Sequence, residues 1–159
     1  MKKVTIALII ATAAFACSRR PPESRVRNVE ARIDGLTCPT CVPPLKASLK
    51  RAYAKSDIDV DDDRDTATVR FADGENFSTA DFRTAVERVR MRVVSVRLQA
   101  CGSVEEADGA KWLTAGTNRF RLDSDRDVPV RKPICVTGTL DPHSDPATLQ
   151  VSSFSENAK

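Results

Sequence analysis

The segment Gly35–Cys41 places two cysteines three residues apart, between a strand-like stretch and a helix-like stretch. Residues 29–33, before it, alternate apolar and polar side chains, which predicts a strand. Residues 42–53, after it, carry apolar side chains at helical spacing, and their two prolines fall in the first turn, where backbone N–H groups lack partners anyway. The leading glycine allows a tight turn between the two elements. The sequence therefore predicts that Cys38 and Cys41 share one strand-to-helix loop, where both sulfurs can close on a single ion.

The same pattern continues along the N-terminal half of the chain. Alternating apolar residues predict further strands at 58–60, 66–71 and 92–98, and the last strand is expected to direct Val94 and every second residue after it inward. Residues 79–89 carry an apolar stripe at helical spacing and predict a second helix. The resulting order βαββαβ is that of the ferredoxin-like fold, in which two helices cover one face of a sheet.

Within this frame, the motif Gly35-Leu36-Thr37-Cys38-Pro39-Thr40-Cys41 resembles the signature of the heavy-metal-associated domain family, Gly-Met-Thr-Cys-x-x-Cys at the start of the first helix. The family includes copper chaperones, copper-transport ATPases and the periplasmic mercuric-ion-binding protein. The resemblance covers residues 29–98, and Leu36 in place of Met is a change at a packing position. It implies that Cys38 and Cys41 hold one soft metal ion, copper(I) or mercury(II), because thiolates select soft cations over hard ones.

The loop after the second predicted helix departs from that family. Arg90 and Met91 stand where the family often has Gly followed by Tyr, Phe or Lys, beside the metal. The Met91 thioether could act as an auxiliary group near the metal and favour copper(I), or the side chain could simply fill core space. The sequence leaves both roles open, and it also leaves open the conformation of a loop with Arg90 in place of glycine.

The second half of the chain has a different character. Residues 101–156 contain short β-prone stretches separated by Pro and Gly turns, without a helical stripe. The sequence thus predicts the α+β class: a ferredoxin-like βαββαβ metal-binding domain at 28–100, followed by a small antiparallel β unit that could be OB-like. Cys101 and Cys135 lie at the edges of this unit. A disulfide between them is the default in a small exported domain, and a second soft-metal site is the alternative.

The N-terminus has the features of an export signal. Residues 1–17 comprise a basic start, an apolar stretch and small residues at the end, as in a secretory signal peptide. The apolar stretch is shorter than the roughly 20 residues that span a bilayer. The end, Ala14-Phe15-Ala16-Cys17, fits ordinary signal cleavage and also resembles a bacterial lipobox, which we favour because a cysteine follows the cleavage point directly. Cys17 would then be lipidated, and Ser18 after it favours the outer membrane. Residues 18–27 are polar and predict a tether.

The overall composition narrows the classes of function. The chain has 25 basic and 22 acidic residues; two basic ones, Lys2 and Lys3, would leave with the signal peptide, so that 23 basic residues face 22 acidic ones. A nearly neutral mature chain of roughly 140 residues, with interspersed charges, argues against nucleic-acid binding. The aspartate-rich segments 59–63 and 123–127 lack the glycine and the closing glutamate of a calcium loop, which predicts solvated turns. The single histidine, His143, supports neither a catalytic zinc nor a catalytic triad, and we do not expect an enzyme.

Together these features predict a periplasmic protein, held at the membrane only by a lipid anchor, that binds one copper(I) or mercury(II) ion between two thiolates. Its partners would be a metal-transporting membrane protein or another thiol-bearing metal acceptor. Zinc fits less well, because it prefers four ligands. Two alternatives remain. Cys-Pro-Thr-Cys also resembles the dithiol of a thiol–disulfide redox module, although no proline between Pro44 and Pro129 can serve as the later cis-proline of a thioredoxin fold. The chain could also be an interaction module whose Cys38–Cys41 pair stays oxidised.

Overall fold

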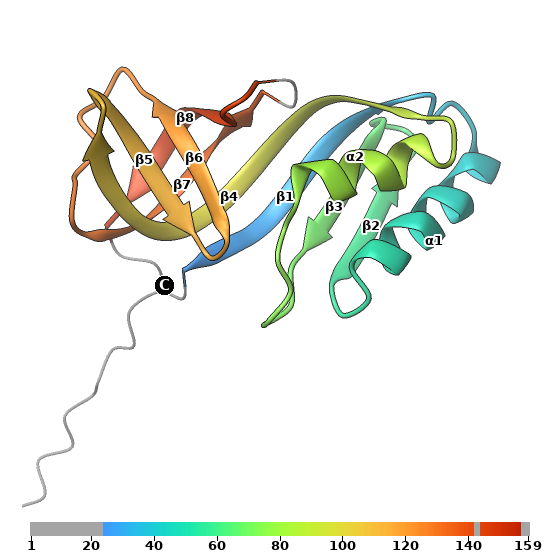
Figure 1. Cartoon of the computed structure of the whole chain (residues 1–159). Helices are drawn as coiled ribbons and strands as arrows, with labels where there is room; N and C mark the ends of the chain where they lie inside the picture. The colour runs from blue at the N-terminus through green and yellow to red at the C-terminus, as the bar shows by residue number, and fades with distance from the viewer. Residues whose placement is uncertain (1–23, 142–143, 157–159) are drawn as a thin grey trace, which may run out of the picture.

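The computed structural model describes residues 24–141 and 144–156, whose strands all belong to one eight-stranded sheet. The elements are β1 (Arg25–Asp34), the short 3-10 helix η1 (Pro39–Cys41), α1 (Val42–Ala52), β2 (Asp57–Asp61), β3 (Thr66–Arg70), α2 (Thr79–Glu87), β4 (Arg92–Ala107), β5 (Ala110–Ala115), β6 (Asn118–Asp123), β7 (Pro133–Leu140) and β8 (Thr148–Ser155). The strand order is β2-β3-β1-β4-β5-β6-β8-β7, and β4 also pairs with β7. Strands β4 to β8 therefore close into a barrel beside an open, helix-covered part of the sheet (Figure 1).

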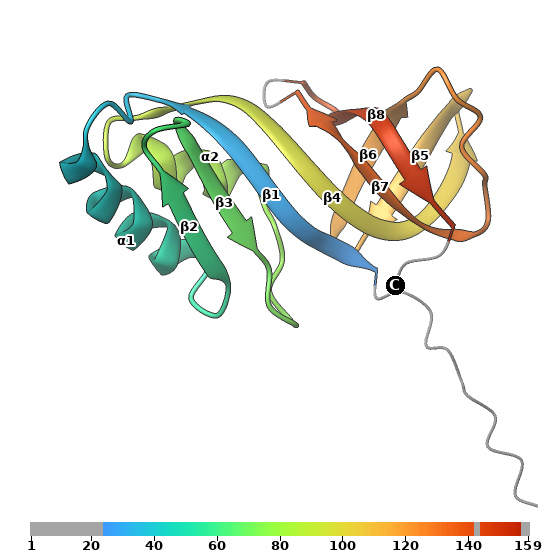
Figure 2. The same ribbon diagram turned by 180° about the vertical axis from the view of Figure 1, so that it is seen from behind.

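The predicted fold class is wrong. Among the described residues 49% are in strands and 18% in helices, and a closed five-stranded barrel replaces the expected ferredoxin-like domain followed by a small antiparallel unit. The physical reason is β4, a strand of 16 residues whose two edges pair with different partners. It pairs with β1 through residues 92–101 and with β7 through residues 96–103, so that one strand belongs to both halves of the sheet (Figure 2). The barrel is not wholly antiparallel either, because β6 and β8 run parallel.

The boundary expected between the metal-binding domain and the small β unit, between residues 100 and 101, falls inside β4. The expected tether, 18–27, overlaps the start of β1 at Arg25, and its first part lies outside the described residues together with the predicted signal peptide, 1–17.

Both helices pack on the same face of the open part of the sheet (Figure 1). The inward residues of α1 include Leu45 and Leu49, and those of α2 include Phe82 and Val86; all four are almost fully buried. Ser48, also buried, donates a hydrogen bond of 2.6 Å from its hydroxyl to the carbonyl of Ala85, so that this buried polar group in α1 is satisfied by the backbone of α2. This packing holds the start of α1, and with it the cysteine loop, at one end of the sheet.

A β-bulge changes which side chain of β4 faces the core. Arg32 pairs with Ser95 and Ile33 with Val93, so that Val94 is an extra residue in the ladder. A bulge of this kind turns its extra residue away from the regular alternation. Val93 accordingly packs against the core, whereas Val94 is 53% exposed, and the sequence prediction that Val94 faces inward is wrong.

Two glycines leave room for neighbouring backbones where strands of the barrel approach each other closely. A Cβ atom on Gly102, in β4, would overlap the carbonyl oxygen of Thr114, and one on Gly138, in β7, would overlap that of Gln150. A carbonyl oxygen in a paired strand cannot move aside without breaking the ladder. These two positions therefore fix how closely β4 approaches β5 and how closely β7 approaches β8.

Replacing Gly102 with alanine should lower the free energy of unfolding by about 3 kcal/mol, because the overlap forces a backbone shift in the barrel. Gly74 is the matched control, since a Cβ there meets nothing within 4 Å. Alanine at this position would cost only the backbone strain of its φ of +81°, about 1–2 kcal/mol. Urea denaturation followed by circular dichroism measures both. Equal destabilisation by the two variants would contradict the close approach at Gly102.

Candidate functional site

The cysteine loop lies between β1 and α1 and brings Cys38 and Cys41 together. Cys38 precedes η1 in an extended conformation, and Cys41 is the residue directly before α1. The amide of Cys41 donates a 2.8 Å hydrogen bond to the carbonyl of Cys38, which closes the turn. The Cα atoms are 5.3 Å apart and the two sulfurs lie at disulfide distance. Gly35 has φ +97°, a conformation that glycine adopts without strain, so the tight turn predicted before the cysteines is present.

The surroundings of this pair favour reactive thiolates once the sulfurs are reduced. Both cysteines are partly exposed, and Cys41 also packs against the edge of the core. The Cys38 sulfur lies 3.2 Å from the hydroxyl oxygen of Thr40, a group that can donate a hydrogen bond to a thiolate. The first turn of α1 carries no acidic side chain, so the positive end of the helix is not neutralised there. A helix N-terminus of this kind stabilises the thiolate relative to the thiol.

The donor set at the loop fits a soft ion of low coordination number. Among residues 24–141 and 144–156, no group of three or more His, Cys, Asp or Glu side chains gathers closely enough to hold a metal. Two thiolates alone suit copper(I) or mercury(II), whereas zinc takes four ligands. In the disulfide arrangement the sulfurs leave no space for an ion between them. Reduction, followed by separation of the two sulfurs, must therefore come before any metal binds.

Met91, the predicted auxiliary group, lies under the cysteine loop. It is only 6% exposed and belongs to the hydrophobic core. Its Cγ would be 3.5 Å from a Cβ placed on Gly35, so the side chain supports the turn that precedes the cysteines. Arg90, before it, has φ +63°, a left-handed conformation at the position where the heavy-metal-associated family often has glycine.

Met91→Leu separates the packing role of Met91 from a ligand role, because leucine keeps the volume and removes the thioether. The burial of Met91 leads us to expect copper(I) and mercury(II) affinities within about twofold of the unchanged protein, and a loss of stability below about 1.5 kcal/mol. Competition titrations with both ions measure the affinities. A loss of copper(I) affinity alone would show instead that the thioether acts on the ion.

The second cysteine pair has a different environment. Cys101 in β4 lies directly opposite Cys135 in β7, with Cα atoms 4.0 Å apart and sulfurs at disulfide distance. Cys101 is fully buried and Cys135 is 6% exposed. The pair thus joins two strands inside the molecule, away from solvent metal ions, whereas the pair at the loop faces solvent.

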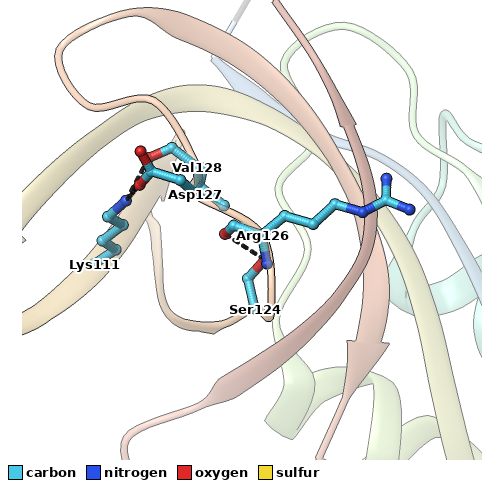
Figure 3. A network of polar contacts seen from close by, with 5 residues as sticks. All are labelled: Lys111, Ser124, Arg126, Asp127 and Val128. Atoms are coloured by element: carbon cyan, nitrogen blue, oxygen red, sulfur yellow. Dashed lines mark hydrogen bonds and ion pairs between the residues drawn. The ribbon is translucent and has the colours of Figure 1, made fainter.

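The aspartate-rich segment 123–127 is arranged by hydrogen bonds around its own backbone and one lysine (Figure 3). Lys111 pairs with the Asp127 carboxylate and donates a 2.7 Å hydrogen bond to the carbonyl of Val128. The hydrogen bond from Lys111, and then its charge, hold the pKa of Asp127 below the ordinary value of aspartate. Ser124 accepts a 3.1 Å hydrogen bond from the amide of Arg126. The lysine neutralises one carboxylate of this segment, which further weakens any case for a cation site there.

Several residues near the loop were not identified from the sequence. A cleft of about 280 Å³ beside the loop is lined by Arg32, Ile33, Asp34, Gly35, Thr37, Asp65 and Val94. Asp65 comes from the turn between β2 and β3, and Val94 is the bulged residue of β4, so these parts meet only after the sheet has formed. The exposure of Val94 depends on a register shift for which the sequence carries no local signal.

Other predicted residues lie outside the part of the chain that the structure describes, namely Cys17 and His143. In the described part, no helix has both the length and the apolar character needed to cross a membrane.

Comparison with protein-family models, curated proteins and solved structures finds no match to this chain. Membership of the heavy-metal-associated family therefore stays a prediction, and the site has to be interpreted from its own geometry.

Proposed function

We propose that the protein binds one soft metal ion, copper(I) or mercury(II), between the thiolates of Cys38 and Cys41, and transfers it to a thiol-bearing acceptor. The observation that supports this proposal is the meeting of two partly exposed sulfurs at the start of a helix. No further His, Cys, Asp or Glu in the described residues joins them in a larger ligand group. The other described cysteine pair is buried and serves the fold instead.

Transfer follows from the low coordination number. Two protein sulfurs leave the bound ion open on its solvent side, where a thiolate of a partner can add without first displacing a ligand. Cys38, which unlike Cys41 is not packed against the hydrophobic core, would then leave as a thiolate near the start of the helix. The proposed acceptors are a metal-transporting membrane protein or another protein with a pair of thiols.

A competition titration tests this function. Protein reduced with a phosphine, under argon, is titrated with copper(I) in the presence of a coloured copper(I) chelator, and separately with mercury(II). One ion per chain, bound tightly enough to take copper(I) from the chelator, is the expected result. Absence of stoichiometric binding of either ion would contradict the proposal.

The disulfide distance between the two sulfurs favours a second candidate, thiol–disulfide exchange with another dithiol. Catalytic dithiols have reduction potentials of roughly −120 to −270 mV, whereas structural disulfides lie below about −300 mV. Equilibration of the Cys38–Cys41 pair with a graded thiol buffer measures this potential. A value in the upper range together with no metal binding would favour redox exchange, and a pair that resists reduction would favour the interaction module with a permanently oxidised pair.

Export and anchoring are proposed from the N-terminal sequence, which lies outside the described residues. Replacing Cys17 with serine should release the protein from membranes into the soluble periplasm, because stable anchoring requires a multiply acylated cysteine. Membrane fractionation measures the release, and mass spectrometry of the mature N-terminus checks the modification. An unmodified Cys17 on a soluble protein would contradict the lipid anchor.

A further inference from the structure

The sulfur of Cys38 has a side-chain neighbour that the proposed metal site does not use, the hydroxyl of Thr40. The two atoms lie 3.2 Å apart. In the disulfide arrangement the Cys38 sulfur carries no hydrogen, so the Thr40 hydroxyl is the donor of this contact and the sulfur is the acceptor. Among residues 24–141 and 144–156, no side chain forms a hydrogen bond with the sulfur of Cys41. The two sulfurs of the pair are therefore not equivalent.

The backbone around the turn supplies few competing donors. Three of the six residues 39–44 are prolines, which carry no N–H. The amides of Cys41 and Val42 already donate to the carbonyls of Cys38 and Pro39. Five of these six positions thus offer the sulfur no N–H, and the start of α1 acts on it through the helix dipole. The Thr40 hydroxyl is the direct donor that the described structure places at Cys38.

Packing distinguishes the two sulfurs in the same direction. Cys41 packs against the hydrophobic core, whereas Cys38 does not and precedes the helical turn in an extended conformation. The core packing therefore restrains Cys41 and not Cys38. Thr40 is exposed and Cys38 is partly exposed. A partner that approaches from solvent meets Cys38 together with the hydroxyl that is bonded to its sulfur.

We propose that Thr40 is a positioning residue that makes Cys38, rather than Cys41, the sulfur that reacts with a partner first. Its hydroxyl bonds to the Cys38 sulfur in the disulfide and continues to do so once that sulfur is free, when the full negative charge of a thiolate strengthens the hydrogen bond. The contact thus favours the free sulfur of Cys38 over the bonded one. The inference rests on the proposed function only for the identity of the ion, because the difference between the two sulfurs belongs to the loop itself.

In metal transfer, this difference sets the order of the steps. A thiolate of the acceptor adds to the ion, and the bond between the ion and Cys38 breaks. Cys38 leaves with its electron pair as a thiolate, which accepts the hydrogen bond from Thr40. The ion keeps its charge, and no group is oxidised or reduced. Cys41, restrained by the core, stays on the ion until a second acceptor thiolate replaces it.

Partial alkylation of the reduced full-length protein tests the proposal without any metal. When less than one equivalent of iodoacetamide is added, a cysteine sulfur bonds to the methylene carbon of the reagent, iodide leaves and the thiol proton passes to solvent. Fragmentation mass spectrometry gives the ratio of modification at Cys38 to that at Cys41. Thr40→Val, which replaces the hydroxyl with a methyl group, should lower this ratio about fivefold through the loss of one hydrogen bond. Thr40→Ser keeps a hydroxyl and should restore the ratio.

Thr37→Val is the matched control. Thr37 is an exposed threonine of the same loop whose side chain forms no hydrogen bond within the described residues, so the ratio should not change. The same ratio in the Thr40→Val and Thr37→Val variants would overturn the proposal, and so would a fall that Thr40→Ser does not reverse. If such a protein still bound one ion per chain, the proposed function would stand and only this inference would fail. Where one copper(I) per chain is bound, its transfer to excess glutathione, followed by stopped flow, should be about fivefold slower in Thr40→Val and unchanged in Thr37→Val.

Discussion

A protein in which Cys38 and Cys41 are both replaced by serine should bind neither copper(I) nor mercury(II) stoichiometrically. Two thiolates supply nearly all of the binding energy in a two-coordinate site, and thiolate sites of proteins bind their metals with about 10 kcal/mol or more. The affinity should therefore fall by more than about 10⁴-fold. Because both side chains are partly exposed and lie in a loop, the fold should remain, with a near-unchanged circular dichroism spectrum.

The single variants and the buried pair provide the controls. Cys38→Ser and Cys41→Ser should each keep one thiolate and lose most of the affinity, whereas replacement of Cys101 and Cys135 should leave the metal stoichiometry unchanged. Competition titration of all four reduced proteins against the same chelator gives the comparison. Unchanged stoichiometry in the Cys38/Cys41 double variant would place the metal elsewhere in the chain.

Replacing both Cys101 and Cys135 with alanine should cost about 4 kcal/mol of folding free energy. The bond between them would close a loop with a sequence separation of 34 residues, and constraining a loop of that length in the unfolded chain contributes about this amount. Both residues are buried, Cys101 in β4 and Cys135 opposite it in β7, so the substitution also removes packing between these two strands. The melting temperature should fall by more than about 10 °C.

Urea denaturation of the oxidised proteins measures this effect, and the Cys38/Cys41 double variant is the matched control. That control removes a bond with a sequence separation of 3, whose loop is too short to constrain the unfolded chain comparably. A loss of less than about 1 kcal/mol in the Cys101/Cys135 variant would show that the buried pair does not form a disulfide.

The local elements of this fold could be predicted from the sequence, because they depend on neighbouring residues. Alternation at 29–33 and 66–71 and helical spacing at 42–53 indicate β1, β3 and α1 where the structure has them. The overall architecture could not be predicted, because it depends on long-range pairing. Nothing local shows that β4 continues for 16 residues and pairs with β1 on one edge and β7 on the other.

The candidate site shows the same division. The spacing of the two cysteines and the glycine before them predict that both sulfurs share one turn, which the structure has. The cleft beside them is formed by Arg32, by Asp65 from a distant turn and by Val94 from β4. Val94 is exposed because one extra residue in β4 shifts the ladder, and simple alternation in the sequence predicts the opposite orientation.

X-ray absorption spectroscopy of the reduced protein loaded with one equivalent of copper(I) tests the central claim most directly. If Cys38 and Cys41 hold the ion as proposed, the spectrum should show a two-coordinate copper with two sulfur neighbours. The protein fraction of the Cys38/Cys41 double variant should contain no copper with this spectrum. A site with three or four neighbours that include nitrogen or oxygen, or the same spectrum in the double variant, would contradict binding between these two thiolates.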